Sequence, residues 1–468
     1  MTAAAEVVLL RVDRAASHHT AHPRHVHPPL ALKYIQAQLQ TPEAPVPLLD
    51  GWLAPFSTEA FVTRALALKP AFAVVHGVTW CLEESIAVGR RLRAAGVVTI
   101  AVGQQVAHVG RSPHPLWAAA FDHAVGGEPE LAVPALIARL RAGEPAAPGG
   151  DAHEVRAPDA LVSPAFSEAE MRDYAFPFPL RGQPVKRWAY LLTSWGCPRP
   201  CRHCTEIVRR SVGRNLRERS VDRVVDDMLR LRDAGAEFLC LDDDSLPVHR
   251  ERFLALCDAL ERRAPGLRWM ANARPDELDA ERVEAAAAAG AVLFKVGVDS
   301  GSARMIEGVG KARDDAAWVA ASERAFGLLE RAGIGSVALF VVGLPGETLA
   351  DAERSLALAR RLPADYLQVQ IYRAYPDVAL WAELAPSGRA GAEEYHYARP
   401  LSNCSEIPTD TLATLQRRFY RAFYFRPGYV ARHARHFWRH YLPRAGHRPA
   451  SRGPSGPLAY LLGIGRSG

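Results

Sequence analysis

The hydrophobic residues of the first 142 positions fall into short apolar runs separated by amphipathic stretches. The apolar runs are typical of buried strands and lie at 7–10, 46–49, 72–77, 97–103 and 123–127. The stretches between them, such as LALKYIQAQL and SIAVGRRLRAAG, repeat apolar residues at the spacing of a helix. Because strands that alternate with helices form parallel sheets, residues 1–142 are predicted to be an open, Rossmann-like α/β domain. Gly96 follows a basic turn and predicts a helix end there.

A second alternating series begins after a break in this pattern. Residues 143–185 are rich in Gly, Pro and Ala and are predicted to be a linker. Six strands are then predicted, at 188–193, 237–242, 267–272, 292–298, 336–342 and 366–372. Six strand–helix units favour a partial (β/α)6 barrel of TIM type over residues 186–400, whose chemistry is expected at the carboxyl ends of its strands.

Composition and charge limit the classes of protein that this chain can be. A length of 468 residues favours two domains, and 49% hydrophobic with 23% charged residues is a globular balance. From Thr411 to Gly468 there are 11 Arg and no Lys, Asp or Glu, so the net charge of +6 becomes 6 − 11 = −5 over the first 410 residues. A nucleic-acid partner is therefore not expected. No apolar run is long enough for a transmembrane segment and no secretory signal is recognised, so we expect a cytoplasmic protein.

The basic C-terminal region, 401–468, is predicted to be helical. Its aromatic residues at 419, 420, 423 and 424 share one helix face, and Arg417, Arg418 and Arg421 lie off that face. The favoured interpretation is a helix that closes the barrel, with its arginines in solvent. The alternative is a basic surface for an anionic substrate, a lipid headgroup or a partner.

Three of the seven cysteines lie within eight residues, in a loop directly after the first predicted barrel strand. The text CPRPCRHC places Cys197, Cys201 and Cys204 at intervals of four and three residues. Thiolates suit iron, and a four-iron cluster with three protein ligands keeps one iron open for a small chelating molecule. The alternative is a zinc site completed by His203 or Cys404. A second pair of closely spaced cysteines, which zinc loops usually have, is absent from the sequence.

This spacing resembles the motif of the radical S-adenosylmethionine (SAM) family. The resemblance implies that Cys197, Cys201 and Cys204 hold a 4Fe-4S cluster and that SAM chelates the open iron. It further implies reductive cleavage of SAM to a 5′-deoxyadenosyl radical, with electrons from a reductant such as flavodoxin or ferredoxin. The same resemblance extends over residues 187–430.

The strand ends of the second series also resemble those of the family. LDDDSLP resembles the acidic strand end that holds the amino group of SAM. WMANARPDEL resembles the third strand, whose arginine can meet the carboxylate of SAM or a substrate anion. VGVDSGSARMIEGVGK resembles the fourth strand end, with aspartate in place of glutamate. Helix capping by the acidic pair and a surface salt bridge of the arginine are the structural alternatives. The SAM contacts implied by the resemblance are His203, Asp242, Asp243, Arg274, Asp299, Ser300 and Lys311.

An α/β domain in front of such a barrel resembles a cobalamin-binding domain, which implies cobalamin as a third cofactor. The D-x-H-x-x-G motif that supplies a histidine to cobalt is absent, and the paired glycine after the fourth strand is GQQ here. The domain could therefore keep the fold without the cofactor. The histidine-rich segment 18–27 is interpreted as a polar loop, with metal binding as the alternative. The implied cobalamin contacts are Gly77, Thr79, Gly103, Gln104, Gly127 and Glu128.

These features predict a cobalamin-dependent radical SAM C-methyltransferase that acts on an unactivated carbon of a small-molecule or peptide substrate. A radical cyclase, rearrangement or oxidation enzyme is the alternative within this class. A sensor that binds cobalamin or the cluster without turnover is the alternative from another class. A methylthiotransferase fits poorly, because Cys81 is the only cysteine before position 197.

Overall fold

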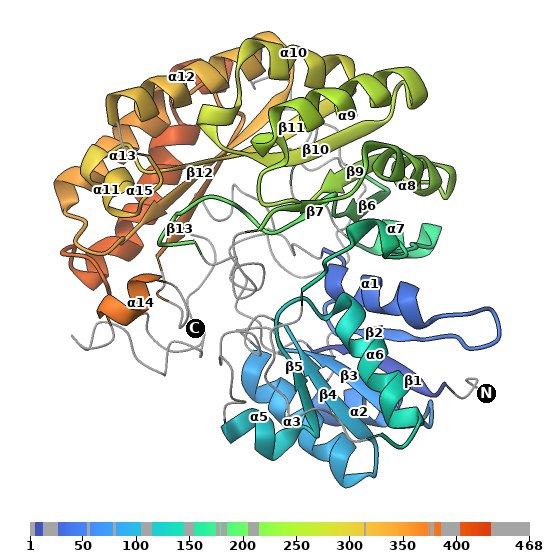
Figure 1. The fold of residues 1–468 in the computed structure, drawn as a ribbon. Coiled ribbons are helices and arrows are strands. Elements are labelled where there is room, and N and C mark those ends of the chain that lie inside the picture. The colour runs from blue at the N-terminus through green and yellow to red at the C-terminus, as the bar shows by residue number, and fades with distance from the viewer. Residues whose placement is uncertain are drawn as a thin grey trace, which may run out of the picture.

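The computed structural model describes two parallel α/β sheets, one for each series of predicted strands (Figure 1). It describes residues 5–12, 27–53, 57–77, 81–103, 115–144, 154–174, 178, 185–204, 215–312, 315–372, 374, 379–384 and 403–431. Both series form as predicted, because each apolar run is long enough to bury a strand on both faces. The fold class predicted from the sequence is confirmed.

The N-terminal sheet is an open, five-stranded sheet with helices on both faces. Its order is β2-β1-β3-β4-β5, and all neighbouring strands are parallel. The direction of winding reverses between β1 and β3, which is the switch point where such sheets bind ligands. The strands are β1 (Val7–Arg11), β2 (Leu48–Asp50), β3 (Phe72–His76), β4 (Val98–Val102) and β5 (His123–Val125).

Alternate residues of these strands enter two different cores. Val7 and Leu9 pack under α1 and α6, whereas Val8 and Leu10 pack under α2, α3 and α5. Gly96, with φ +83°, follows α3 as predicted for a helix end. The helices are α1 (Leu30–Leu39), α2 (Thr58–Leu66), α3 (Leu82–Ala94), α5 (Pro115–Ala120) and α6 (Pro129–Arg141).

The second sheet is wound in one direction only and curves into a partial barrel (Figure 1). Its order is β13-β12-β11-β10-β9-β6, with every neighbouring pair parallel. Helices cover its convex side, so the concave side is left to face the rest of the molecule. The strands are β6 (Trp188–Leu191), β9 (Phe238–Leu241), β10 (Arg268–Ala273), β11 (Ala291–Asp299), β12 (Gly335–Val342) and β13 (Tyr366–Ile371).

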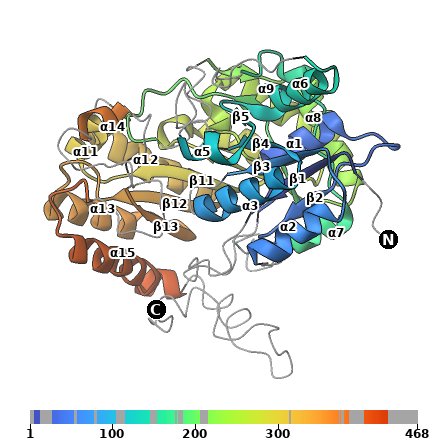
Figure 2. The ribbon, with the colours of Figure 1, turned by 90° about the horizontal axis from the view of Figure 1, so that it is seen from below.

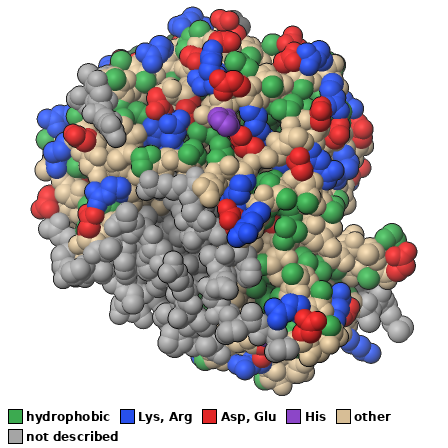
Figure 3. Space-filling model, viewed as in Figure 1, with side chains coloured by type: hydrophobic (Ala, Val, Ile, Leu, Met, Phe, Trp, Pro, Cys, Tyr) green, Lys and Arg blue, Asp and Glu red, His purple; other side chains and the backbone are tan. Residues whose placement is uncertain are grey.

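The helices of this domain are amphipathic and bury their apolar faces in one continuous outer core. Within the described helices, none combines the length and hydrophobicity that crossing a membrane requires. Figure 3 shows acidic and basic side chains interspersed over the visible face. The helices are α8 (Val221–Asp233), α9 (Arg250–Arg263), α10 (Ala280–Ala288), α11 (Ala303–Gly308), α12 (Asp315–Arg331), α13 (Leu349–Arg361) and α14 (Ala379–Leu384), with short helices η3 (Leu246–Val248) and η4 (Pro275–Glu277).

The C-terminal helix α15 (Thr409–Tyr424) packs against β13 and α13, as Figure 2 shows from below. Phe419, Tyr420 and Phe423 are buried in the outer core, as their spacing predicts. The Tyr420 hydroxyl accepts a hydrogen bond from the backbone N–H of Val369 at 3.1 Å, which ties the helix to the edge strand. Arg418 forms an exposed ion pair with Glu353. The arrangement agrees with the closing-helix interpretation. Residues 432–468 lie outside the described residues.

Part of the predicted linker is folded and packed between the two domains. Residues 154–174 contain η2 (Pro158–Ala160) and α7 (Glu168–Asp173), and α7 begins with a capping box at Ser167. Val155 and Leu161 are fully buried together with Tyr34 of α1 and Trp195 of the barrel. Residues 154–166, which contain two prolines and no glycine, are irregular apart from η2 but are nevertheless packed against both domains.

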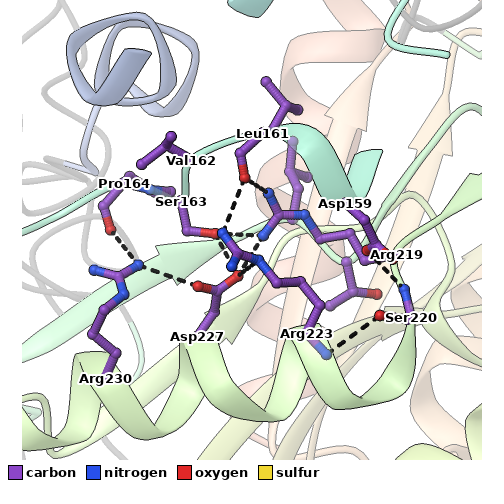
Figure 4. Close-up of polar contacts among 12 residues, drawn as sticks. Asp159, Leu161, Val162, Ser163, Pro164, Arg219, Ser220, Arg223, Asp227 and Arg230 are labelled. Carbon is purple, nitrogen blue, oxygen red and sulfur yellow. Dashed lines mark hydrogen bonds and ion pairs between the residues drawn. The ribbon is translucent and has the colours of Figure 1, made fainter. Parts of the chain in front are cut away.

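A buried ion cluster fastens this segment to the barrel (Figure 4). The guanidinium of Arg219 is completely buried and is paired with Asp227 of α8. Both of these side chains also contact the hydroxyl of Ser163, and Arg219 donates to the Leu161 carbonyl at 2.8 Å. A buried charge of this kind is stable only while its partner and its hydrogen bonds are present.

Further ion pairs and hydrogen bonds join residues that are far apart in the sequence. Arg217 of β8 (Arg217–Glu218), which pairs with β7 (Ser194–Trp195), contacts the Glu128 carboxylate with both terminal nitrogens at 2.6 and 2.7 Å. The Tyr174 hydroxyl donates to Asp50 at 2.9 Å. The two domains are therefore connected by specific polar contacts as well as by the apolar cluster around Trp195.

Candidate functional site

The three-cysteine loop follows β7 at the carboxyl end of the first barrel strand. It starts at Gly196, whose φ is +87°; a β-carbon there would lie 2.2 Å from the carbonyl oxygen of Asn215. The backbone N–H of Arg202 donates to the Val309 carbonyl at 2.7 Å, which joins the loop to the segment after β11. Cys201 is buried, whereas Cys197 and Cys204 are half-buried. The loop is thus held at the edge where barrel enzymes place their chemistry.

Arg274, at the end of β10, lies directly against this loop. Its Nη1 donates to the sulfur of Cys201 at 3.4 Å, and its Nη2 donates to the carbonyl of Lys311 at 2.7 Å. The guanidinium is paired with Asp276 and lies 5.1 Å from the ring centre of Trp318. With 8% exposure, Arg274 is not the surface salt bridge that was the structural alternative. A guanidinium beside a thiol favours the thiolate, which is the form that binds metals.

Asp299 joins His203 and Lys311 next to the cysteine loop. Its Oδ2 lies 2.9 Å from His203 Nε2 and also accepts a hydrogen bond from the Lys311 ammonium. Burial alone would raise the pKa of Asp299, but Lys311 and His203 hold that pKa well below its usual value. Asp299 has φ +65°, which is uncommon outside glycine, so these contacts hold the backbone in a strained conformation at the end of β11.

Other predicted SAM contacts are occupied by structural hydrogen bonds. The Asp243 carboxylate is fully buried and accepts from the backbone N–H groups of Thr193 and Ser194 and from the Thr193 hydroxyl. Ser300 is fully buried, and its hydroxyl contacts Ser355 at 2.9 Å. Asp242 and Asp244 of LDDDSLP are both half-buried, and the contact of Asp242 with SAM stays a prediction.

The predicted cobalamin contacts are divided among different roles. Gly103 and Gly77 lie at the carboxyl edge of the N-terminal sheet, where a β-carbon on Gly103 would be 2.3 Å from the Gly77 carbonyl oxygen. A β-carbon on Gly77 would lie 2.6 Å from the Trp117 ring, so packing explains why both positions lack a side chain. Gly127 has φ +74°, as a tight turn requires. Thr79 and Gln104 lie outside the described residues.

Glu128 was predicted to contact cobalamin, and the structure assigns its carboxylate to another interaction. It is 2% exposed, is paired with Arg217 through both oxygens, and accepts the backbone N–H of Val155 at 2.5 Å. The carboxylate thus has three donors from the barrel and the linker, and its contact with cobalamin stays a prediction. The pairing with Arg217 spans 89 residues of sequence, which no local pattern reveals.

Sequence reasoning did not single out His76, which lies at the switch point between β1 and β3. His76 ends β3 opposite Arg11 of β1, and its Nδ1 is buried without a hydrogen-bond partner in the described part of the chain. Burial lowers the pKa of His76 to about 3, so its imidazole is neutral at physiological pH. The sequence did contain a sign of this role, because a polar residue that ends an apolar strand lies at the edge where such sheets bind ligands.

Polar residues on the concave face of the barrel were also missed. Tyr190 of β6, Cys240 of β9 and Lys295 of β11 alternate with residues of the outer core. Burial raises the pKa of both the Tyr190 hydroxyl and the Cys240 thiol well above their usual values, so both keep their protons. An alternation of polar and apolar residues within each strand was the signal that could have identified them.

Glu347, in the GLPGET turn after β12, is expected to make the free energy of unfolding depend on pH. It is fully buried, and its Oε2 accepts the backbone N–H groups of Gly343 and Leu344. Burial raises the pKa of Glu347 to about 7. A carboxyl whose pKa is raised on folding stabilises the folded protein while it is protonated. This contribution is complete below the unfolded pKa of about 4.5 and is lost as the pH rises through 7. The free energy of unfolding then falls by about 3 kcal/mol.

Glu347→Gln is therefore expected to remove much of the fall in unfolding free energy that this group causes between pH 5.5 and 8. Anaerobic denaturant titrations at pH 5.5, 6.5 and 8 measure it. The matched control is Glu261→Gln on the exposed side of α9. If Glu347→Gln and Glu261→Gln keep the same pH slope, the buried carboxyl does not titrate near pH 7.

Within the described residues, no three His, Cys, Asp or Glu side chains are close enough to hold one metal ion. The arrangement at the strand ends is instead a loop of three cysteines surrounded by Arg274, Asp299 and Lys311. Such a set can bind a cluster through sulfur and can bind a small ligand that has both a carboxylate and a cationic group.

The radical SAM superfamily is the family whose model matches this chain, over residues 191–359. The chain therefore contains a radical SAM domain, and the resemblance stated from the cysteine spacing is confirmed. Radical SAM domains use a 4Fe-4S cluster and SAM, as predicted.

Two curated relatives cover about half of this chain. An uncharacterized methyltransferase of Pyrococcus horikoshii is 24% identical over 241 residues, which are 51% of this chain and 51% of the relative. The anaerobic magnesium-protoporphyrin IX monomethyl ester cyclase of Rubrivivax gelatinosus is 25% identical over 241 residues, which are 50% of this chain and 42% of the cyclase. The match thus spans about half the length of these relatives or less.

Two solved structures share the fold over most of the chain. The radical SAM methyltransferase TsrM of Kitasatospora setae, solved with cobalamin and a 4Fe-4S cluster, has a TM-score of 0.64 at 18% identity and covers 82% of this chain and 75% of its own. The cobalamin-dependent radical SAM enzyme OxsB has a TM-score of 0.55 at 17% identity. The match covers 89% of this chain and 61% of OxsB. These similarities establish the two-domain fold.

Proposed function

We propose that this chain is a cobalamin-dependent radical SAM methyltransferase that methylates an unactivated carbon. The observation that carries the proposal is the cysteine loop at the barrel's carboxyl edge, with Arg274 on the Cys201 sulfur and the Asp299 cluster beside it. The radical SAM match over residues 191–359 supports the same site.

The residues present fit the cluster and SAM. Cys197, Cys201 and Cys204 provide three soft thiolates, and Arg274 stabilises negative charge on one of them. When bound, the cluster and SAM supply a 5′-deoxyadenosyl radical, with electrons from a donor such as flavodoxin or ferredoxin. Asp242 is suited to the amino group of SAM, and the Asp299 cluster orients its ribose. The remaining protein contribution is to hold the substrate in place and exclude water.

The N-terminal sheet fits a large flat cofactor at its switch point. Among the described residues, the buried Nδ1 of His76 has no hydrogen-bond partner, and the adjoining Gly77 adds no side chain to the edge. TsrM and OxsB, which share this fold, were solved with cobalamin bound. When bound, cobalamin supplies a methyl donor to the substrate radical. The edge formed by β1, β3 and β4 of this chain would hold the cofactor.

Product analysis tests the proposal without knowledge of the substrate. Anaerobically reconstituted protein with cobalamin, SAM and a reductant is expected to release S-adenosylhomocysteine as cobalamin is methylated. It is also expected to form 5′-deoxyadenosine as SAM is cleaved. Formation of neither product contradicts the radical SAM chemistry, and a sensor without turnover then becomes the better account.

A radical cyclase is the second function that a specific observation favours. Two relatives of about 25% identity are named as anaerobic magnesium-protoporphyrin IX monomethyl ester cyclases. A cyclase cleaves SAM without transferring its methyl group. Formation of 5′-deoxyadenosine with no S-adenosylhomocysteine would therefore favour the cyclase over the methyltransferase.

Asp299→Asn is expected to weaken SAM binding. The substitution keeps the shape and tolerance of positive φ but removes the charge that holds Lys311 and His203, whose hydrogen bonds are charge-assisted. Charged hydrogen bonds contribute about 1.5–3 kcal/mol, so the dissociation constant for SAM is expected to rise about 10- to 100-fold. Equilibrium dialysis with reconstituted enzyme measures it, with the exposed Asp233→Asn as control. An unchanged SAM affinity would remove Asp299 from the binding site.

A further inference from the structure

His27 lies at the switch point of the N-terminal sheet. Its backbone carbonyl accepts a hydrogen bond at 2.8 Å from Arg11, the last residue of β1, and Arg11 lies opposite His76, the last residue of β3. Arg11 is itself fixed, because it is buried and its guanidinium is paired with the Asp50 carboxylate. The winding of the sheet reverses between β1 and β3, so the backbone of His27 is held where such sheets bind ligands.

The imidazole of His27 is held in one orientation and one tautomer. Its ring centre lies 5.1 Å from that of Trp52 and 6.1 Å from that of Tyr190 on β6, with the ring planes at 72° and 85°. Its Nδ1 lies 3.2 Å from the carbonyl oxygen of Pro28. Because a carbonyl can only accept, Nδ1 carries the hydrogen and donates it. The lone pair of the neutral ring is therefore on Nε2.

This lone pair on Nε2 is available to a ligand. None of the described residues donates a hydrogen bond to Nε2, and His27 is exposed, so a ligand can reach this nitrogen. The protein around the ring nevertheless desolvates its charged form, and together with Arg11 it lowers the pKa of His27 to about 4. The imidazole is therefore neutral at physiological pH, which is the form that coordinates metals.

These properties are those of a metal ligand. A metal-binding histidine usually donates its other N–H to a carboxylate or a backbone carbonyl, which fixes the tautomer, as the Pro28 carbonyl does here. A metal held by side chains alone needs several ligands, and within the described residues no three His, Cys, Asp or Glu side chains converge on one point. A metal whose remaining ligands belong to a cofactor needs only one histidine. Cobalamin is such a cofactor, because the nitrogens of its corrin ring surround the cobalt.

We propose that His27 Nε2 is an axial ligand of the cobalt when cobalamin is bound at this edge. The inference rests on the proposed function, because it takes the switch point as the cobalamin site. It gives a role to one residue of the histidine-rich segment 18–27 in a sequence that lacks the D-x-H-x-x-G motif. His76 is less suited, because its Nδ1 is buried and no described residue forms a hydrogen bond that would fix its tautomer.

EPR spectroscopy of cob(II)alamin in the reconstituted enzyme, with its cluster in the oxidised, EPR-silent state, tests this assignment. The unpaired electron of cob(II)alamin lies along the axial direction of the cobalt, so an axial ¹⁴N splits its hyperfine lines into triplets and an axial ¹⁵N into doublets. We expect triplets with ordinary protein and doublets with protein that contains ¹⁵N-labelled histidine. His27→Ala is expected to lose the doublets. His249→Ala, which changes an exposed histidine of the barrel, is the matched control and is expected to keep them.

Other spectra overturn the assignment. Triplets in both samples mean that the dimethylbenzimidazole base of the cofactor coordinates the cobalt, and unsplit lines in both mean that no nitrogen does. Doublets that persist in His27→Ala assign another histidine, and their loss in His76→Gln would then identify His76. Each of these results leaves the proposed function standing, because cobalamin is bound. A protein that binds no cobalamin contradicts both this inference and the cobalamin-dependent function on which it rests.

Discussion

Cys201→Ala is expected to abolish reductive cleavage of SAM. The substitution removes one of three thiolates and leaves the Arg274 guanidinium, 8% exposed, without the sulfur that it contacts. Loss of a residue that hydrogen-bonds to a metal ligand already lowers metal affinity or activity about 10- to 100-fold. Loss of the ligand itself lowers them further. Production of 5′-deoxyadenosine by the reduced, reconstituted variant is therefore expected to fall by more than about a hundredfold.

Cys257→Ala is the matched control for this result. Cys257 lies in α9 and is buried in the outer core, so its substitution costs stability by leaving a small cavity but does not touch the loop. Iron content, the EPR signal after dithionite and 5′-deoxyadenosine should all remain. Retained SAM cleavage in Cys201→Ala, or stoichiometric zinc in the wild-type loop, would contradict the cluster assignment.

Asp227→Asn is expected to lower the free energy of unfolding by about 3–5 kcal/mol. The change leaves the Arg219 guanidinium buried without its counter-ion, and breaking a buried pair by removing one partner has a cost of this size. Ser163 loses the same partner, so the segment 154–174 is expected to detach from the barrel before the rest unfolds. Denaturant titration and hydrogen exchange of residues 154–174 measure the two effects.

Asp226→Asn provides the comparison within the same helix turn. Asp226 is exposed and pairs with Arg263 on the surface, where ion pairs contribute about 0–1 kcal/mol. The two variants remove the same charge from neighbouring positions, one in the buried cluster and one in an exposed ion pair. Equal losses of stability in both would show that the cluster in Figure 4 does not hold the linker segment to the barrel.

The positions of the strands along the chain and the helical face of α15 could be predicted because both depend on local periodicity. β11 shows why: its outward residues Phe294, Val296 and Val298 form an apolar series with period two, which a strand requires whatever packs on it. The same holds for Phe419, Tyr420 and Phe423, whose helical spacing predicted a buried face. The packed segment 154–174 was not predicted, because its burial depends on residues of two other elements.

The sequence by itself determined the three-cysteine loop, its place after the first barrel strand and the two α/β series, since ligand spacing and strand periodicity are properties of neighbouring residues. Only the tertiary structure decided which charged residues remain available. It assigned Asp243 to Thr193 across 50 residues and Glu128 to Arg217 across 89. Whether a charge is compensated depends on which side chains the fold brings within hydrogen-bonding distance, and residues distant in the sequence supply those partners.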